Sequence, residues 1–174
     1  VMDVNASLAI DENRVQLWGR WGNNNKAQAW VIEKVNPNKE TQLIQDGIYN
    51  ITTALNNNQF LDVAKGNTED YAKVQLFHKW RENNAAQQWQ FKHLGNNEYQ
   101  IISKLSNKAI SVNLNKVQNG EQLFLLPADS NSCSQKWKAI QNGTGLVFKN
   151  SCNPIYVMDV NASLAIDENR VQLW

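Results

Sequence analysis

The chain has 174 residues and a formal net charge of +1, and this length fits a single domain. A charge so close to neutral excludes the strong basic field of proteins that bind nucleic acid or anionic membranes. No apolar run approaches the roughly 20 residues of a membrane span. The chain starts without Met or a signal-peptide pattern, so we interpret it as a mature domain or a slice of a longer chain. The 26 Asn and 15 Gln supply neutral donors and acceptors, which suit uncharged hydroxylated ligands.

The first and last eighteen residues of the chain are identical. Residues 1–18 and residues 157–174 both read VMDVNASLAIDENRVQLW. The rest of the chain repeats only as short motifs. Full identity over eighteen residues therefore favours engineering or a very recent duplication over an old repeat.

Three short motifs recur in the same order along the chain. A run such as M-D-V or L-D-V comes first, at 1–4, 60–63 and 109–112, and a Q-L-W or Q-L-F run follows, at 15–18, 74–77 and 121–124. A Q-x-W motif closes each unit, at Gln28/Trp30, Gln87/Trp89 and Gln135/Trp137. The three Q-x-W tryptophans are 59 and 48 residues apart. The constant order identifies a true internal repeat with units of about 50 residues.

Each unit is expected to form short strands. In the second unit, four runs at 47–55, 59–65, 72–80 and 87–94 are separated by the turn-forming segments NNN, GNTED and RENNAA. No apolar pattern of period 3.6 extends over a helical length. The sequence therefore predicts an all-β fold of three four-stranded units, which can close on one another and leave few exposed sheet edges.

This arrangement resembles the ricin-B-type lectin family, whose fold is the β-trefoil. The resemblance rests on three Q-x-W motifs in phase, each with its two accompanying motifs, and it covers essentially the whole chain. It implies one domain over 1–174, with units at 47–94 and 95–142 and a divided first unit made of 1–46 plus 143–174. The trefoil would start within unit one, as in a circular permutant, because the strand that should precede Met2 is found at 145–160.

A closed trefoil has one place for the first two motifs of unit one, and two identical copies cannot both fill it. Exposing the apolar side chains of the spare copy costs about 1.5–3 kcal/mol each relative to burial. The chain could be a slice of a tandem array, or the spare copy could enter a neighbouring molecule. Alternatively, the two copies could compete for one place in an engineered permutant with overlapping ends. The sequence leaves these three arrangements open.

The resemblance also implies where sugars bind. In the family, the Asp of the first motif accepts hydrogen bonds from two adjacent sugar hydroxyls, an aromatic ring stacks on the sugar, and polar residues up to the Gln of Q-x-W complete the site. Charge-assisted bonds are strong, and a ring face matches the C–H patch of a galactose-like sugar. Site one would comprise Asp3, Trp18, Trp21, Asn24, Asn25 and Gln28, with Asp159 and Trp174 as duplicates of Asp3 and Trp18. Site two would comprise Asp62, Phe77, Trp80, Asn83, Asn84 and Gln87.

The stretch W-x-x-N-N-x-x-Q-x-W occurs in both sites, and a core alone does not need this repetition. Family members often carry Asn directly before the Gln of Q-x-W, whereas this chain has Ala27 and Ala86 there. The assignment of the sugar-contacting amide therefore stays open. The stacking ring is also open, between Trp18 and Trp21 in site one and between Phe77 and Trp80 in site two. The Gln of each motif could equally bond the backbone, and the Q-x-W tryptophans are expected in the core.

The third unit departs further from the family pattern. Ser111 replaces the Asp, and no aromatic residue matches Trp21. We expect no sugar to bind in this unit.

The expected function is a carbohydrate-binding lectin domain with two sites for galactose or N-acetylgalactosamine-type glycans. Its partners would be glycans of cell-surface glycoproteins, glycolipids or polysaccharides, and a swapped oligomer or a longer parent chain is possible. The alternative is a protein-binding β-trefoil, such as a cytokine-like ligand, an inhibitor or a toxin-assembly subunit. No catalytic arrangement suggests an enzyme, and no cofactor, metal or nucleic acid is expected. Cys133 and Cys152 could form one disulfide, which would fit a secreted or extracellular protein.

Overall fold

The computed structural model describes residues 2–4, 15–17 and 42–174. The chain divides into two compact units, Val1–Lys39 and Glu40–Trp174. In the first unit, β1 (Met2–Val4) pairs antiparallel with β2 (Val15–Leu17), and Asp3 lies opposite Gln16. The expectation that 1–46 and 143–174 together form one trefoil unit stays a prediction.

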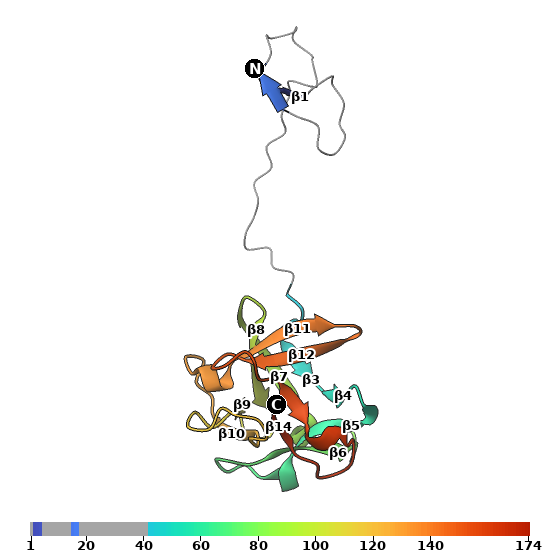
Figure 1. Cartoon of the computed structure of the whole chain (residues 1–174). Coiled ribbons are helices and arrows are strands. Elements are labelled where there is room, and N and C mark those ends of the chain that lie inside the picture. Colours follow the sequence, from blue (N-terminus) through green and yellow to red (C-terminus); the bar gives the residue numbers. More distant parts are fainter. Residues whose placement is uncertain (1, 5–14, 18–41) are drawn as a thin grey trace. The chain divides into compact units, whose positions relative to one another are not determined.

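The second compact unit consists of short strands joined by turns and single-turn 3₁₀ helices, which confirms the all-β prediction (Figure 1). Its strands are β3 (Gly47–Tyr49), β4 (Thr52–Thr53), β5 (Asn56–Val63), β6 (Val74–His78), β7 (Trp89–Gly95), β8 (Glu98–Ser103), β9 (Lys108–Ser111), β10 (Phe124–Pro127), β11 (Trp137–Asn142), β12 (Gly145–Asn150), β13 (Met158–Val160) and β14 (Val171–Leu173). Its 3₁₀ helices are η3 (Ala64–Gly66), η4 (Ala85–Gln87), η5 (Cys133–Gln135) and η6 (Asn161–Ser163).

Three antiparallel hairpins meet near the centre of this unit: β5–β6, β9–β10 and β13–β14. The backbone N–H of Val74 donates to Leu123 O at 3.0 Å, and the N–H of Leu123 donates to Val171 O at 2.9 Å. The Gln122 amide nitrogen lies 2.7–3.0 Å from the carbonyl oxygens of these same three residues. The three hairpins are thus related by an approximate threefold arrangement, as the repeat predicts.

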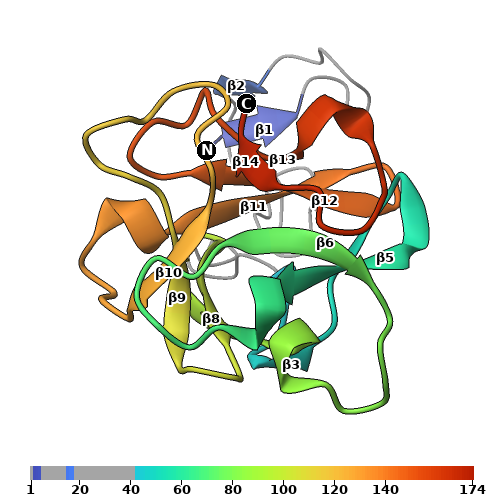
Figure 2. The same ribbon diagram turned by 90° about the horizontal axis from the view of Figure 1, so that it is seen from below.

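A second layer of strands pairs in the order β3–β7–β8–β11–β12, and β9 and β10 extend it from β8. Figure 2 shows β8, β9 and β10 side by side. Trp89 opens β7 and Trp137 opens β11, and both are fully buried. The Trp89 indole N–H donates to Leu61 O at 2.9 Å, and that of Trp137 donates to Ile110 O at 3.1 Å. The Q-x-W tryptophans of these two units are therefore core residues, as predicted.

The C-terminal copy of the duplicated segment belongs to the core of the second compact unit. Its strands β13 and β14 place Asp159 opposite Gln172, the register that Asp62 and Gln75 adopt in β5 and β6. Val171, Gln172 and Leu173 are buried. In the body formed by Glu40–Trp174, the place of the first two motifs of unit one is therefore filled by residues 157–174.

The third unit differs from the expected alignment of its second motif. Ser111 pairs with Phe124, whereas the equivalent Asp62 pairs with Gln75. The structural counterpart of 74–77 is thus 123–126, and the Q-L-F run at 121–124 is displaced by two residues. The prediction that 121–124 is equivalent to 74–77, which was based on the shared Q-L-F residues, was therefore wrong.

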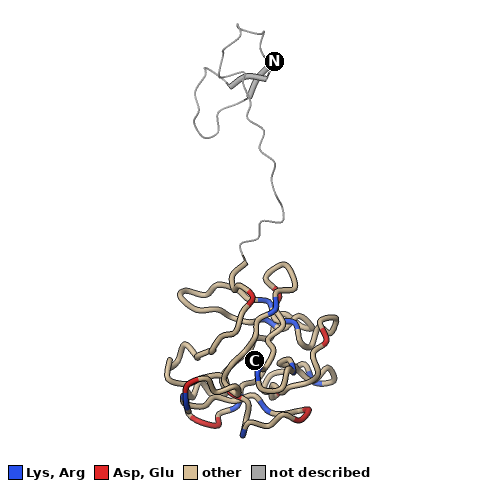
Figure 3. Tube along the Cα trace, turned by 180° about the vertical axis from the view of Figure 1, so that it is seen from behind, with Lys and Arg blue, Asp and Glu red and all other residues tan. Residues whose placement is uncertain are grey.

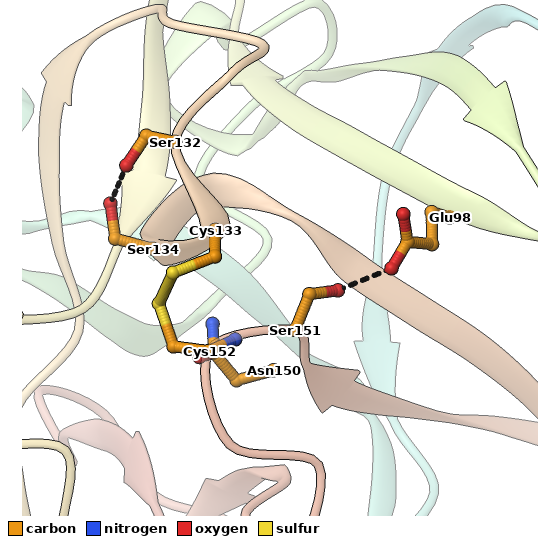
Figure 4. The surroundings of a disulfide bond; sticks show 7 residues. All are labelled: Glu98, Ser132, Cys133, Ser134, Asn150, Ser151 and Cys152. Carbon is orange, nitrogen blue, oxygen red and sulfur yellow. Dashed lines mark hydrogen bonds between the residues drawn. A yellow bond between two sulfur atoms is a disulfide. The ribbon is translucent and has the colours of Figure 1, made fainter.

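A disulfide joins Cys133 in η5 to Cys152, with their Cα atoms 4.9 Å apart (Figure 4). Beside it, the Cys152 N–H donates to Asn150 Oδ1 at 3.1 Å, and the Ser151 hydroxyl donates to Glu98 Oε1 at 2.7 Å. The bridge therefore fastens the segment after β12 to the turn before β11.

Basic and acidic residues are interspersed along the trace of residues 42–174 (Figure 3). Among the described residues, no helix has the length and apolar character needed to cross a membrane.

Candidate functional site

A cavity of about 610 Å³ lies over the β5–β6 hairpin and the loop that follows it. It contains four of the residues predicted for site two. The full lining is Asp62, Val63, Lys65, Gly66, Gln75, Phe77, Trp80, Arg81, Asn84, Ala86 and Glu168.

The Asp62 carboxyl group lies at the buried side of this cavity, with 5% of the residue exposed. Gln75, directly opposite on β6, donates from Nε2 to Asp62 Oδ1 at 3.1 Å. Burial raises the pKa of Asp62 to about 6, against hydrogen bonds from Gln75 and Gln87 that lower it, while the negative charge of Asp167 raises it further. At neutral pH the group is ionised and offers acceptor positions to a ligand.

Two aromatic rings form a platform at the same cavity. The Phe77 and Trp80 ring centroids are 5.9 Å apart, with 26° between the ring planes. Trp80 is 70% exposed, whereas Phe77 is half-buried. Both candidates for the stacking ring thus lie in one surface, and Trp80 presents the larger free area.

The three predicted amides have different positions. Asn84 lines the cavity, and its Oδ1 accepts from the Ala86 N–H at 3.2 Å, which caps η4. Asn83 adopts a left-handed φ of 54°, a conformation that Asn tolerates, and it does not line the cavity. Gln87 is buried and donates from Nε2 to His78 O at 2.9 Å. The structure therefore brings Asn84 to the cavity and gives Gln87 a role in holding the end of β6.

Asp167, which belongs to the C-terminal copy, also binds the end of β6. Asp167 Oδ1 accepts from the His78 N–H at 2.7 Å and from Gln59 Nε2 at 3.1 Å, and its Oδ2 lies 2.6 Å from His78 Nδ1. Slight desolvation raises the pKa of Asp167, but the bonds and charge of His78 together with the Gln59 bond hold it below the usual range. Asp167 is therefore ionised at neutral pH.

Several lining residues were missed from the sequence. Gln75 could have been found from the pairing of the two motifs, because it lies opposite Asp62. Lys65 and Arg81 carry no motif signal. Glu168 comes from the C-terminal copy, so only the packing of one unit against the next brings it to the cavity.

The structure describes only some of the residues predicted for site one. Asp159 accepts from Gln172 Nε2 at 3.1 Å, as Asp62 does from Gln75, and Trp174 is 59% exposed. Asp3 is described only as part of the β1 backbone. The other predicted members of this site lie outside the described residues: Trp18, Trp21, Asn24, Asn25 and Gln28.

The third unit has different chemistry at the corresponding place. Ser111 is buried, and its hydroxyl donates to Ala109 O at 2.9 Å. The register of β9 and β10 places Phe124 where site two has Gln75 and Leu126 where it has Phe77. The carboxylate and its amide partner are both replaced in this unit, and the absence of sugar binding there stays a prediction.

A threefold set of hairpins with an acidic group and an aromatic platform in one cavity defines a β-trefoil of the lectin type. The family model described as ricin-type beta-trefoil lectin domain-like matches residues 85–174, which is more than half of the chain. The chain belongs to this family.

Solved structures show the same fold. The designed threefold-symmetric protein ThreeFoil matches with a TM-score of 0.67 and 22% identity over 74% of this chain and 89% of its own. The Rhizoctonia solani agglutinin matches with a TM-score of 0.65 and 15% identity, over 75% and 87% of the two chains. The C-half of the earthworm R-type lectin, solved with GalNAc, matches with a TM-score of 0.56 and 22% identity, over 73% and 87%. No curated protein sequence matches the chain significantly.

Proposed function

We propose that the protein binds glycans that carry galactose or N-acetylgalactosamine, and that the Asp62 cavity is its principal sugar site. The observation that carries this proposal is the buried Asp62 carboxyl group in one cavity with the Phe77–Trp80 platform. A saccharide needs both features, because its hydroxyls seek a strong acceptor and its C–H face seeks an apolar ring.

The site has an arrangement suited to a small polar ligand. Gln75 and Gln87 hold the Asp62 carboxyl group, so little freedom is lost when a sugar binds. Asn84 adds an amide at the cavity wall. The cavity of about 610 Å³ lies in the range of pockets that take drug-sized ligands, so it has room for more than one hexose.

Further observations support the type of sugar and an extracellular location. The earthworm lectin half that shares the fold was solved with GalNAc, which favours a sugar of this type here. A second site around Asp159 and Trp174 would raise affinity for multivalent glycans through avidity. The disulfide between Cys133 and Cys152 favours a secreted or extracellular protein. The domain would act by binding rather than by catalysis.

A glycan array followed by calorimetry with a soluble galactoside tests the proposal. We expect Asp62→Ala to reduce binding at this site at least tenfold without a loss of folding. Asp70→Ala is the matched control, because Asp70 pairs with Lys108 outside the cavity lining. If the parent protein binds no glycan, the sugar-binding proposal fails and a protein-binding trefoil becomes the better account.

A further inference from the structure

Among the residues that the structure describes, no strand of the second layer lies between β12 and β3. Among the described strands, its order is β3–β7–β8–β11–β12. Each strand that starts with a Q-x-W tryptophan pairs with neighbours on both sides: β7 with β3 and β8, and β11 with β8 and β12. Continuing the threefold pattern, one more strand of this kind belongs between β12 and β3.

An apolar cavity of about 310 Å³ lies at this open position. The threefold repeat indicates which side chain fits this cavity, because the residues around the tryptophans of the other two units can be compared with its lining. Trp89 lies opposite Ser103 and Tyr49, and Trp137 lies opposite Asn150 and Tyr99.

The same alignment identifies the residues that would surround the tryptophan of the remaining unit. Thr53 corresponds to Ser103 and Asn150, and Leu146 corresponds to Tyr49 and Tyr99. Met158 precedes Asp159 as Leu61 precedes Asp62, and Leu61 O accepts the Trp89 indole N–H. Thr53, Leu146 and Met158 all line the cavity. The cavity is therefore the place of a third tryptophan.

We infer that this open edge binds the Gln28–Val35 segment of a second copy of the chain, with Trp30 in the cavity. Trp30 belongs to the remaining Q-x-W motif, and its segment lies outside the described residues.

The chain before β3 favours a second copy as the source. The Leu43 N–H donates to Asn97 Oδ1 at 3.0 Å, and the Ile44 N–H donates to the Tyr99 hydroxyl at 3.0 Å. Asp46 Oδ1 accepts from the His93 N–H at 2.9 Å. These bonds hold residues 43–46 against the β7–β8 hairpin.

The other two Q-x-W strands, β7 and β11, are each joined to the next strand by a short turn. Only residues 96–97 separate β7 from β8, and only residues 143–144 separate β11 from β12. The bonded segment before β3 replaces such a tight turn. Reciprocal exchange of the Gln28–Val35 segment between two copies would give a closed twofold dimer.

The first test is the solution mass of the full chain over a concentration series without sugar. We expect a dimer of twice the 19.8 kDa chain mass. Trp30→Ala should raise the dimer dissociation constant at least about a hundredfold, because a large side chain leaves an apolar cavity. Trp21→Ala is the control and should leave the dimer intact.

A cysteine pair keeps the test independent of the tryptophan. The pairing of Gln90 with Ile102 and of Lys138 with Lys149 predicts that Val31 lies opposite Thr52. The double variant Val31→Cys, Thr52→Cys should form a disulfide-linked dimer on a non-reducing gel. A monomeric mass at all concentrations, a cross-link within one chain, or a dimer without this cross-link would each overturn the inference. Sugar binding plays no part in these readouts, so their failure leaves the proposed function standing.

Discussion

The Asp62 carboxyl group should make sugar binding and folding stability respond to pH in opposite directions. Burial raises its pKa from 3.8 to about 6. The sugar needs the ionised form as acceptor, and a group with this pKa is about nine-tenths ionised at pH 7 and about one-tenth ionised at pH 5. We therefore expect the dissociation constant for a neutral galactoside to rise about tenfold between pH 7 and pH 5.

The folding stability changes with pH in the direction opposite to sugar binding. Because the folded pKa lies above the unfolded value, the folded state holds the proton more tightly between pH 4 and pH 6. This contribution is fully present below about pH 4 and is lost as the pH rises through about 6. A shift from 3.8 to about 6 corresponds to a cost of about 3 kcal/mol at pH 7. Asp62→Asn removes the ionised group, so it should stabilise the fold at pH 7 by up to that amount while weakening sugar binding.

Calorimetry from pH 5 to pH 8 and urea denaturation over the same range measure the two responses. His78→Gln serves as the control, because the His78 side chain contacts Asp167 near the site. A pH profile of binding that persists in this variant belongs to Asp62. A dissociation constant that stays flat from pH 5 to pH 7, or an Asp62→Asn protein less stable than the parent at pH 7, would refute the reasoning.

Three further changes test the site and its support. Trp80→Ala removes an exposed ring and should raise the galactoside dissociation constant at least tenfold while the melting temperature shifts by less than about 2 °C; a shift of both would show a structural role. Trp89→Ala empties a fully buried position and should cost about 3–5 kcal/mol in urea denaturation. Reducing the Cys133–Cys152 bridge, which spans 19 residues, should cost about 3 kcal/mol, and an unchanged denaturation midpoint would contradict this.

The sequence predicts the architecture well where a motif has one structural use. The Q-x-W tryptophans are large apolar residues at a regular spacing, and Trp89 and Trp137 occupy equivalent buried places with equivalent hydrogen bonds. The acidic motif was equally informative, because Asp62 and Asp159 both lie opposite a Gln in the same register.

The register of the third unit could not be predicted from its letters. A shift by two residues keeps the same side chains on each face of a strand, so the alternation of apolar and polar residues does not reveal it. Leu123 and Leu125 both face the core, and either matches Leu76. Only the pairing of Ser111 with Phe124 distinguishes the two alignments.

The contribution of the C-terminal copy to site two was also beyond the sequence. Asp167 and Glu168 reach the end of β6 because the third hairpin packs against the first, with the Leu76 N–H bonded to Asn169 O at 2.8 Å. The two copies have identical residues, so no pattern within them could show which one makes these contacts.

We expect hairpin register, more than the presence of motifs, to determine how many sugar sites this protein has. In β5–β6 and β13–β14, the register places a carboxylate opposite a Gln whose amide holds it. In β9–β10, the slip brings Phe124 opposite Ser111, so restoring an Asp at 111 alone would leave a carboxylate without its amide partner and facing an apolar ring. We expect Ser111→Asp to destabilise the fold in urea denaturation and to add no galactoside binding in calorimetry. A stable Ser111→Asp protein with an additional binding site would show instead that the acidic residue, and not the register, determines where a sugar binds.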